Sequence, residues 1–145
     1  MTLRSLTGAN ADPPLRRHAS ATHVGLLACR NEDDAPVGVF NLSEIVRGAL
    51  WSAYLGYYAF EPHAGKGYMS EALGLVLRVA FLALRLHRIE ANVQPANRGS
   101  IALVRGAGFT REGFSRRYVR VAGRWRDHER WALLAEEHGP RERAT

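Results

Sequence analysis

The segment from Met69 to Leu84 limits what this chain can fold into more than any other part of the sequence. Apolar residues recur along it at helical spacing and form one broad face, and Leu75, Val79 and Leu82 add apolar surface elsewhere. A helix of this kind can expose little of its surface to water and needs neighbours to pack against. The broad face consists of Ala72, Leu73, Val76, Leu77, Ala80, Phe81 and Leu84.

Two apolar, strand-like segments flank this helix. Residues 51–60 are rich in aromatics and are halted by Pro62, and residues 87–93 are followed by Pro95. A strand, a helix and a second strand in this order predict a βαβ crossover within one sheet.

Hairpins are predicted on both sides of the crossover. The apolar runs 23–29 and 37–42 are joined by a polar turn, and residues 114–121 and 126–134 are joined by the turn 121–124. These elements together predict an α+β, or mixed α/β, domain built on one sheet.

A short helix is expected to begin at Asn97. As N-cap, the side chain of Asn97 can accept a hydrogen bond from the amide of Ser100, three residues on. Gly106 or Gly108 is expected to end this helix.

With 145 residues, the chain is long enough for one domain with a real core and too short for two. We expect an irregular arm over residues 1–21, a single domain over 22–136 and a polar tail over 137–145. Residues 1–21 show no periodicity and contain a Pro-Pro pair.

Composition excludes several classes of protein. A single cysteine, Cys29, and the absence of a Cys/His cluster with ligand spacing argue against disulfides and metal sites. No apolar run has the length of a membrane span or the pattern of a signal peptide, so the expected location is cytoplasmic.

The formal net charge is +6, from 20 basic and 14 acidic residues, and Lys66 is the only lysine. Such a charge could attract nucleic acid or an anionic cofactor. RNA binding also requires aromatics interleaved with the charge, and only Phe114 to Tyr118 shows this pattern, which fits a strand equally well. We therefore expect no direct nucleic-acid partner.

A glycine turn, Gly65-Lys66-Gly67, leads from the first crossover strand into the long helix. Glycines allow close backbone approach, and the unpaired amides and dipole of a helix N-terminus favour an anion such as a diphosphate. A plain tight turn is the alternative. The turn matches neither the Walker phosphate loop nor the dinucleotide fingerprint.

The order of these elements and motifs resembles the GNAT superfamily of N-acetyltransferases. Within it, four blocks resemble the RimJ branch of the RimJ/RimL group, whose members acetylate protein N-termini, notably of ribosomal proteins. The blocks are NLSEIVRG (41–48), YLGY (54–57), GKGYM (65–69) and WRDH (125–128), and the resemblance covers about residues 24–136.

The resemblance implies acetyl-CoA as co-substrate and assigns residues to it. The diphosphate would meet backbone amides of the loop, although the family's opening Gln or Arg is Ala64 here. The strand end would run beside the pantetheine arm, with an amide near Phe60 polarising the thioester carbonyl. Asn97 would bind the pantetheine or only cap its helix. The implied cofactor residues are Tyr58, Ala59, Phe60, Gly65, Lys66, Gly67, Tyr68, Met69 and Asn97.

The resemblance also implies a catalytic acid. Ser100 occupies the position of the branch's suspected acid for the departing thiolate, and its alternative role is that of an ordinary first-turn helix serine.

The base is less obvious, because Asn92 stands where many relatives carry glutamate. Glu90, on the same strand face, could act through a water or could simply pair with Arg88. Glu44 is a second candidate.

The histidines are expected to have other roles. His63 and His87 could titrate near neutrality, but a strand-end or surface position is the favoured interpretation. The pair Asp127-His128 lacks a nearby nucleophile in sequence and is interpreted as structural.

In one respect the chain departs from the family, because the first strand and two helices that wall the acceptor groove are expected to be lacking. The sheet edge would then be exposed. The leading hypothesis is an N-acetyltransferase acting on a protein N-terminal amine. A small-amine acetyltransferase and a CoA-binding chain without turnover are the alternatives, and the oligomeric state, monomer or homodimer, is left open.

Overall fold

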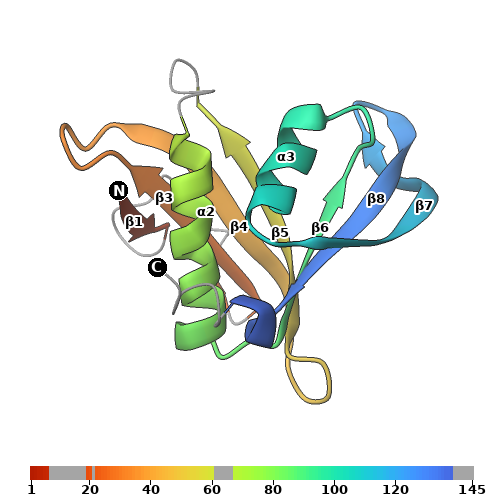
Figure 1. The fold of residues 1–145 in the computed structure, drawn as a ribbon, viewed down its shortest axis with the longest axis horizontal. Helices are drawn as coiled ribbons and strands as arrows, with labels where there is room; N and C mark the ends of the chain where they lie inside the picture. Colours follow the sequence, from red (N-terminus) through yellow and green to blue (C-terminus); the bar gives the residue numbers. More distant parts are fainter. Residues whose placement is uncertain (7–18, 21, 61–66, 139–145) are drawn as a thin grey trace.

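A computed structural model describes residues 1–6, 19–20, 22–60 and 67–138. Its strands form one sheet in the order β1-β3-β4-β5-β6-β8-β7, with β2 pairing β3 (Figure 1). The strands are β1 (Thr2–Ser5), β2 (Ala19–Ser20), β3 (His23–Cys29), β4 (Pro36–Val46), β5 (Ser52–Ala59), β6 (Arg88–Val93), β7 (Thr110–Val121) and β8 (Arg124–Leu134). The α+β class and the βαβ crossover are confirmed.

The sheet opens in its middle. β5 and β6 are the parallel pair, and their register runs only from Ser52 opposite Arg88 to Tyr54 opposite Glu90. Beyond these residues the two strands diverge (Figure 1). The rest of β5 therefore stays paired with β4 on one side, and no strand among the described residues pairs with it on the other.

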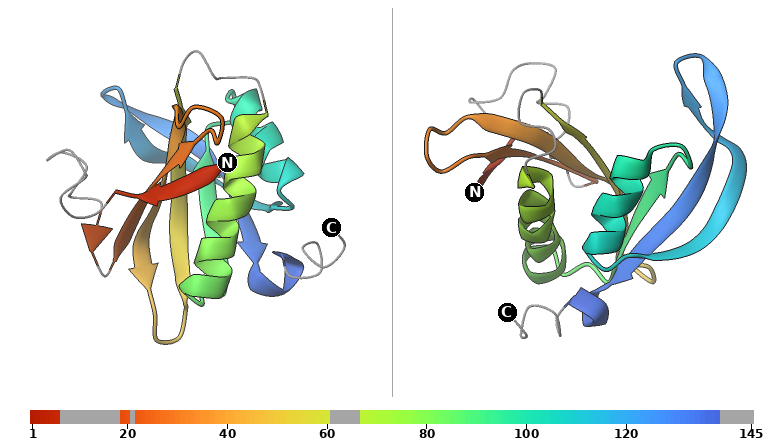
Figure 2. Two further views of the ribbon diagram at one scale, coloured as in Figure 1. Left: turned by 90° about the vertical axis from the view of Figure 1, so that its left-hand side faces the viewer. Right: turned by 45° about the horizontal axis from the view of Figure 1, so that its top comes forward.

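Two helices lie on the same side of the sheet, α2 (Tyr68–Arg78) beside β4 and α3 (Arg98–Gly106) beside β6 (Figure 2). The predicted apolar face of α2 is buried, with Leu73 and Val76 at 0% exposure. It packs on the inward-facing residues of the strands, among them Phe40, Leu42 and Ile89, to form the core. Burial of this face is what holds the helix to the sheet.

The long helix differs from prediction in its second half. After α2 it continues as a π-helix, η2 (Val79–Ala83), closed by a hydrogen bond of 2.9 Å from the amide of Leu84 to the carbonyl of Val79. The wider turn changes the angular position of the residues in it. Leu82, expected to be largely covered, is instead 58% exposed.

The ends of the chain also differ from expectation. Residues 2–5, placed in an irregular arm, form β1 and pair antiparallel with β3 from Thr2 opposite Cys29 to Ser5 opposite Leu26. The strand expected to be lacking at this edge is thus supplied by the first residues, and the edge of β3 is covered. At the other end His138, placed in the polar tail, lies 5.4 Å from the Phe81 ring and is buried.

The terminal hairpin agrees with prediction. β7 and β8 are joined at Ala122 and Gly123, whose φ angles of 51° and 80° suit a two-residue hairpin turn. Among the described residues, no helix has the length and apolar character to cross a membrane.

Candidate functional site

The open edge of β5 is the first component of the site. The Phe60 amide donates to the carbonyl of Val37 at 2.9 Å, and the β4–β5 ladder places Ala59 opposite Gly38 and Tyr57 opposite Phe40. Because peptide groups alternate in direction along a strand, the amides of Tyr57 and Ala59 point away from β4, into the opening. An amide near Phe60 was expected to polarise a carbonyl; the amide of Phe60 itself is paired with β4, and the amides that face the opening are those of Ala59 and Tyr57.

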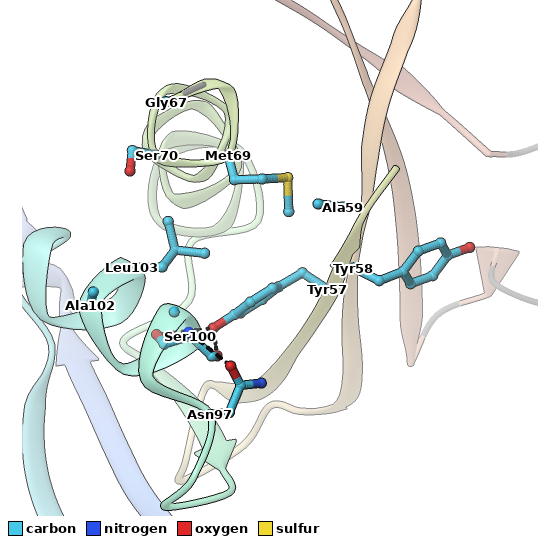
Figure 3. A pocket seen from close by; sticks show the side chains of 11 residues that line it. Tyr57, Tyr58, Ala59, Gly67, Met69, Ser70, Asn97, Ser100, Ala102 and Leu103 are labelled. Atoms are coloured by element: carbon cyan, nitrogen blue, oxygen red, sulfur yellow. Dashed lines mark hydrogen bonds between the residues drawn. The ribbon is translucent and has the colours of Figure 1, made fainter. Parts of the chain in front are cut away.

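A cavity of about 590 Å³ occupies this opening. Its walls come from the end of β5, the start of α2 and the first turns of α3 (Figure 3). The lining residues are Tyr57, Tyr58, Ala59, Gly67, Met69, Ser70, Asn97, Gly99, Ser100, Ala102 and Leu103. Of the expected cofactor residues described, Tyr58, Ala59, Gly67, Met69 and Asn97 line the cavity.

The N-terminus of α2 opens onto the cavity at Gly67. Gly67 is the N-cap with φ 79°, and no side chain of the described residues caps this end of the helix. Its carbonyl accepts from the amide of Glu71 at 3.3 Å, which leaves the amides of the preceding helical residues without helical partners. Gly65 and Lys66, and with them Ala64 and His63, lie outside the described residues.

Gly38 allows the start of α2 to lie close to the sheet. A β-carbon at this position would lie 2.6 Å from the Met69 sulfur and 2.8 Å from the Tyr58 carbonyl oxygen. Tyr68, whose backbone amide is the expected cofactor contact, is the first residue of α2, and its ring lies under the guanidinium of Arg30, whose central carbon is 5.5 Å from the ring centroid.

The third wall begins at Asn97. Its Oδ1 accepts from the Ser100 amide at 3.1 Å, as the spacing predicted. The capping role is therefore confirmed, and the side-chain amide nitrogen of Asn97 remains as a donor at the cavity wall.

The hydroxyl of Ser100 on α3 forms a hydrogen bond with the hydroxyl of Tyr57 on β5, and this bond links the two elements across the opening of the sheet (Figure 3). Burial raises the pKa of the Tyr57 phenol, and its hydrogen bond with Ser100 offsets part of this rise. Tyr57 was not singled out from the sequence, because its partner lies 43 positions away.

Glu90, the first of the two candidate bases, is engaged by an arginine. Its Oε1 accepts from Arg88 Nε at 2.8 Å, and the same guanidinium pairs with Glu112 on β7. The alternative interpretation of Glu90 as the partner of Arg88 is the one that this geometry matches. Asn92 lies on the same strand face, and its Oδ1 is buried without a hydrogen-bond partner among the described residues.

The charge of Glu44 acts on one of a pair of tyrosines. The Tyr118 hydroxyl on β7 hydrogen bonds with Tyr54 on β5, and this bond, followed by burial and the charges of Glu90 and Glu44, raises the pKa of Tyr54. Glu44 itself is exposed, with φ 49°.

The remaining histidines have structural surroundings. His87 is 55% exposed in its side chain, and its Nδ1 lies 3.6 Å from Glu136. His128 is buried, with Nδ1 3.0 Å from the carbonyl of Arg126, and Asp127 accepts from the Arg117 amide at 2.8 Å. The structural interpretation of the Asp127-His128 pair fits these contacts.

The ion pair between Arg88 and Glu112 predicts that the stability of the fold depends on pH. The hydrogen bond and charge of Arg88 hold the pKa of the Glu112 carboxyl below its ordinary range. A lowered pKa means that the ion pair stabilises the fold at neutral pH, and that this contribution is lost as the pH falls below about 4. Because Glu112 is 38% exposed in its side chain, we expect an effect of at most about 1 kcal/mol.

The measurement is urea denaturation across the acid range for the wild-type chain and Glu112→Gln. At neutral pH the free energy of unfolding of Glu112→Gln should be lower than that of the wild-type chain. It should also decrease less as the pH is lowered. Equal pH profiles for the two proteins would contradict the prediction.

Comparisons with known proteins now bear on this site. Residues 4–110 match the model of the acetyltransferase (GNAT) domain. The chain belongs to the GNAT acetyltransferase family.

Alignments with individual acetyltransferases cover most of this chain. It is 45% identical over 112 residues to the probable N-acetyltransferase YjcK of Bacillus subtilis, covering 77% of this chain and 61% of that protein. It is 36% identical over 124 residues to the [ribosomal protein uS5]-alanine N-acetyltransferase of Escherichia coli, covering 86% and 63%.

A solved GNAT structure gives the same fold. Mycobacterium smegmatis RimJ in complex with CoA-disulfide matches with a TM-score of 0.77 and 35% identity, covering 89% of this chain and 62% of that one. The chain therefore spans less than two thirds of the length of these relatives. GNAT proteins use acyl-CoA, and the cavity at the β5 edge is where this GNAT domain offers amides and a helix N-terminus together.

Proposed function

We propose that this GNAT domain is an acetyl-CoA-dependent N-acetyltransferase that transfers the acetyl group to a protein N-terminal amine. The observation that carries the proposal is the cavity between the open edge of β5 and the N-terminal ends of α2 and α3. It combines three features that a CoA thioester needs: strand amides, a helix terminus for phosphate and a hydroxyl.

The extended edge of β5 suits the pantetheine arm. The amides of Tyr57 and Ala59 can pair with its amide groups as a further strand would, because β6 has already diverged. One of these two amides can also polarise the thioester carbonyl. Asn97 can add a hydrogen bond through its side-chain nitrogen, because its cap to Ser100 uses only Oδ1.

The start of α2 suits the diphosphate. Gly67 turns the backbone in the left-handed region, and no side chain in the described part of the chain caps the following amides of Tyr68 and Met69. An anion there would gain both these donors and the helix dipole. Gly65 and Lys66 remain predicted contributors to the same site.

The reaction proceeds by direct attack in a ternary complex. The neutral amine nitrogen bonds to the thioester carbonyl carbon, the carbon–sulfur bond breaks, and the sulfur leaves with the electron pair. Ser100, which lines the cavity, is the proposed donor to that sulfur. Glu44 is the more available carboxylate for the amine proton, since Arg88 holds Glu90.

The choice of acceptor is supported by the relatives. A protein that is 36% identical is a ribosomal protein uS5-alanine N-acetyltransferase, and the RimJ structure shares 35% identity. We accordingly propose an alanine N-terminus of a ribosomal protein as the acceptor, with the cytoplasm as its setting.

The test is made in two steps. Calorimetric titration should detect acetyl-CoA binding, and mass spectrometry should then find one added acetyl group on the N-terminus of an alanine-starting peptide. A polyamine assayed in parallel represents the small-amine alternative. Turnover of the polyamine with none of the peptide would refute the proposed acceptor, and failure to bind acetyl-CoA would refute the proposed function.

A second candidate function is CoA binding without turnover. The observation that favours it is the ion pair of Glu90 with Arg88, together with Asn92 in place of the usual glutamate. Retained acetyl-CoA binding with no acetylation of either acceptor would select this candidate.

A further inference from the structure

The phenol of Tyr57 is held in one position inside the cavity wall. Its ring centroid lies 5.8 Å from that of Phe40 on β4, which is fully buried. Packing of this kind restricts the ring to a single orientation. That orientation directs the hydroxyl across the opening of the sheet to Ser100 on α3 (Figure 3).

The hydrogen bond has a preferred direction. The Tyr57 phenol has one hydrogen to donate, and its two neighbouring acceptors are the Ser100 carbonyl oxygen, at the long distance of 3.5 Å, and the nearer Ser100 Oγ. A phenol is a stronger acid, and so a better donor, than an aliphatic alcohol. Its greater acidity and the nearness of Oγ make Tyr57 the donor and Ser100 Oγ the acceptor.

This direction leaves the hydrogen of Ser100 unused. The Ser100 Oγ has no other partner within the part of the chain that the structure describes. The serine lines the cavity, so its O–H can turn toward an atom of a bound substrate. Accepting a hydrogen bond from Tyr57 also strengthens Ser100 as a donor, because hydrogen bonds in a chain polarise one another.

We propose that Tyr57 is a positioning residue that orients and polarises the Ser100 hydroxyl toward the sulfur of CoA. The inference rests on the proposed function of the cavity. As the carbon–sulfur bond breaks, the Ser100 O–H stabilises the thiolate and passes it a proton. Ser100 regains that proton from water, and the new amide nitrogen releases one through Glu44 to water, so the protons balance.

The experiment is a double-mutant cycle on the full chain with Tyr57→Phe, Ser100→Ala and both together. Phenylalanine keeps the ring and its contact with Phe40. We expect Tyr57→Phe to lower kcat about tenfold, with KM for acetyl-CoA changed less than about twofold. If Tyr57 acts through Ser100, the double variant should have the same kcat as Ser100→Ala.

Two further variants guard against a purely structural effect. Ser100→Thr keeps a hydroxyl, and adding Tyr57→Phe to it should again lower kcat about tenfold. If the double variant loses kcat by the product of the two single-variant losses, the proposal is overturned. It is also overturned if Tyr57→Phe raises KM and leaves kcat unchanged.

A second readout does not depend on turnover. The ultraviolet absorbance of the thiolate measures the ionised fraction of CoA bound to each protein. A donor to the thiolate lowers the pKa of the CoA thiol, so Tyr57→Phe should reduce the ionised fraction at neutral pH by up to about tenfold. An unchanged fraction would overturn the proposal. Absence of CoA binding by the wild-type chain would instead refute the proposed function, and this inference with it.

Discussion

Gly67→Glu is expected to lower the affinity for acetyl-CoA by about 100-fold, or roughly 2.7 kcal/mol. The glutamate carboxylate would sit at the N-terminus of α2, where it would satisfy the free amides itself and repel the diphosphate. A side chain at φ 79° also strains the backbone by about 1 kcal/mol. Calorimetric titration with acetyl-CoA measures the first effect, and urea denaturation measures the second.

Gly48→Glu is the matched control. Gly48 has φ 67° in the turn between β4 and β5, and, like Gly67, it has no atom within 4 Å of an added β-carbon. Its side chain would lie outside the cavity lining. Gly48→Glu should lower the free energy of unfolding about as much as Gly67→Glu does and leave the affinity for acetyl-CoA unchanged. If the two variants bind acetyl-CoA equally well, the N-terminus of α2 is not part of the binding site.

Leu73→Ala is expected to destabilise the fold by about 3 kcal/mol. Leu73 is fully buried in the face of α2 that packs on the sheet, and its truncation leaves a cavity that close-packed neighbours fill only in part. The melting temperature should fall by roughly 10 °C. Urea denaturation followed by circular dichroism gives the free energy of unfolding directly.

Leu82→Ala makes the same chemical change on the same run of helix. Because Leu82 is 58% exposed in the π-helical segment, its loss should change stability by less than about 0.5 kcal/mol. A large effect at Leu82 with a small one at Leu73 would mean that the helix buries a different face.

The sequence predicted the features that depend on short spacings. The apolar period of residues 69–84 identified the buried face of α2, and the three-residue interval from Asn97 to Ser100 identified the cap of α3. The glycine at the start of α2 and the hairpin turn at residues 121–124 were likewise predicted, because both depend on local backbone requirements. Such signals are carried by neighbouring residues and need no knowledge of tertiary contacts.

The features that were missed depend on distant partners. Tyr57 meets Ser100 only because β5 and α3 face each other across the opened sheet. Strand β1 has little apolar periodicity of its own, and it is a strand because β3 offers an unpaired edge. The paired state of the Phe60 amide follows from the register of β4 with β5, which no local pattern reveals.

The three-residue contact between β5 and β6 has a mechanical consequence. On one side of this contact β5 is hydrogen-bonded to β4 and β3 follows, and on the other side β6 is hydrogen-bonded to β8 and β7 follows. The sheet therefore consists of two halves that are joined through only three paired residues of β5 and β6. A substrate that contacts both the edge of β5 and α3 would link the two halves. Occupancy of the cavity would then set how cooperatively the two halves of the domain unfold.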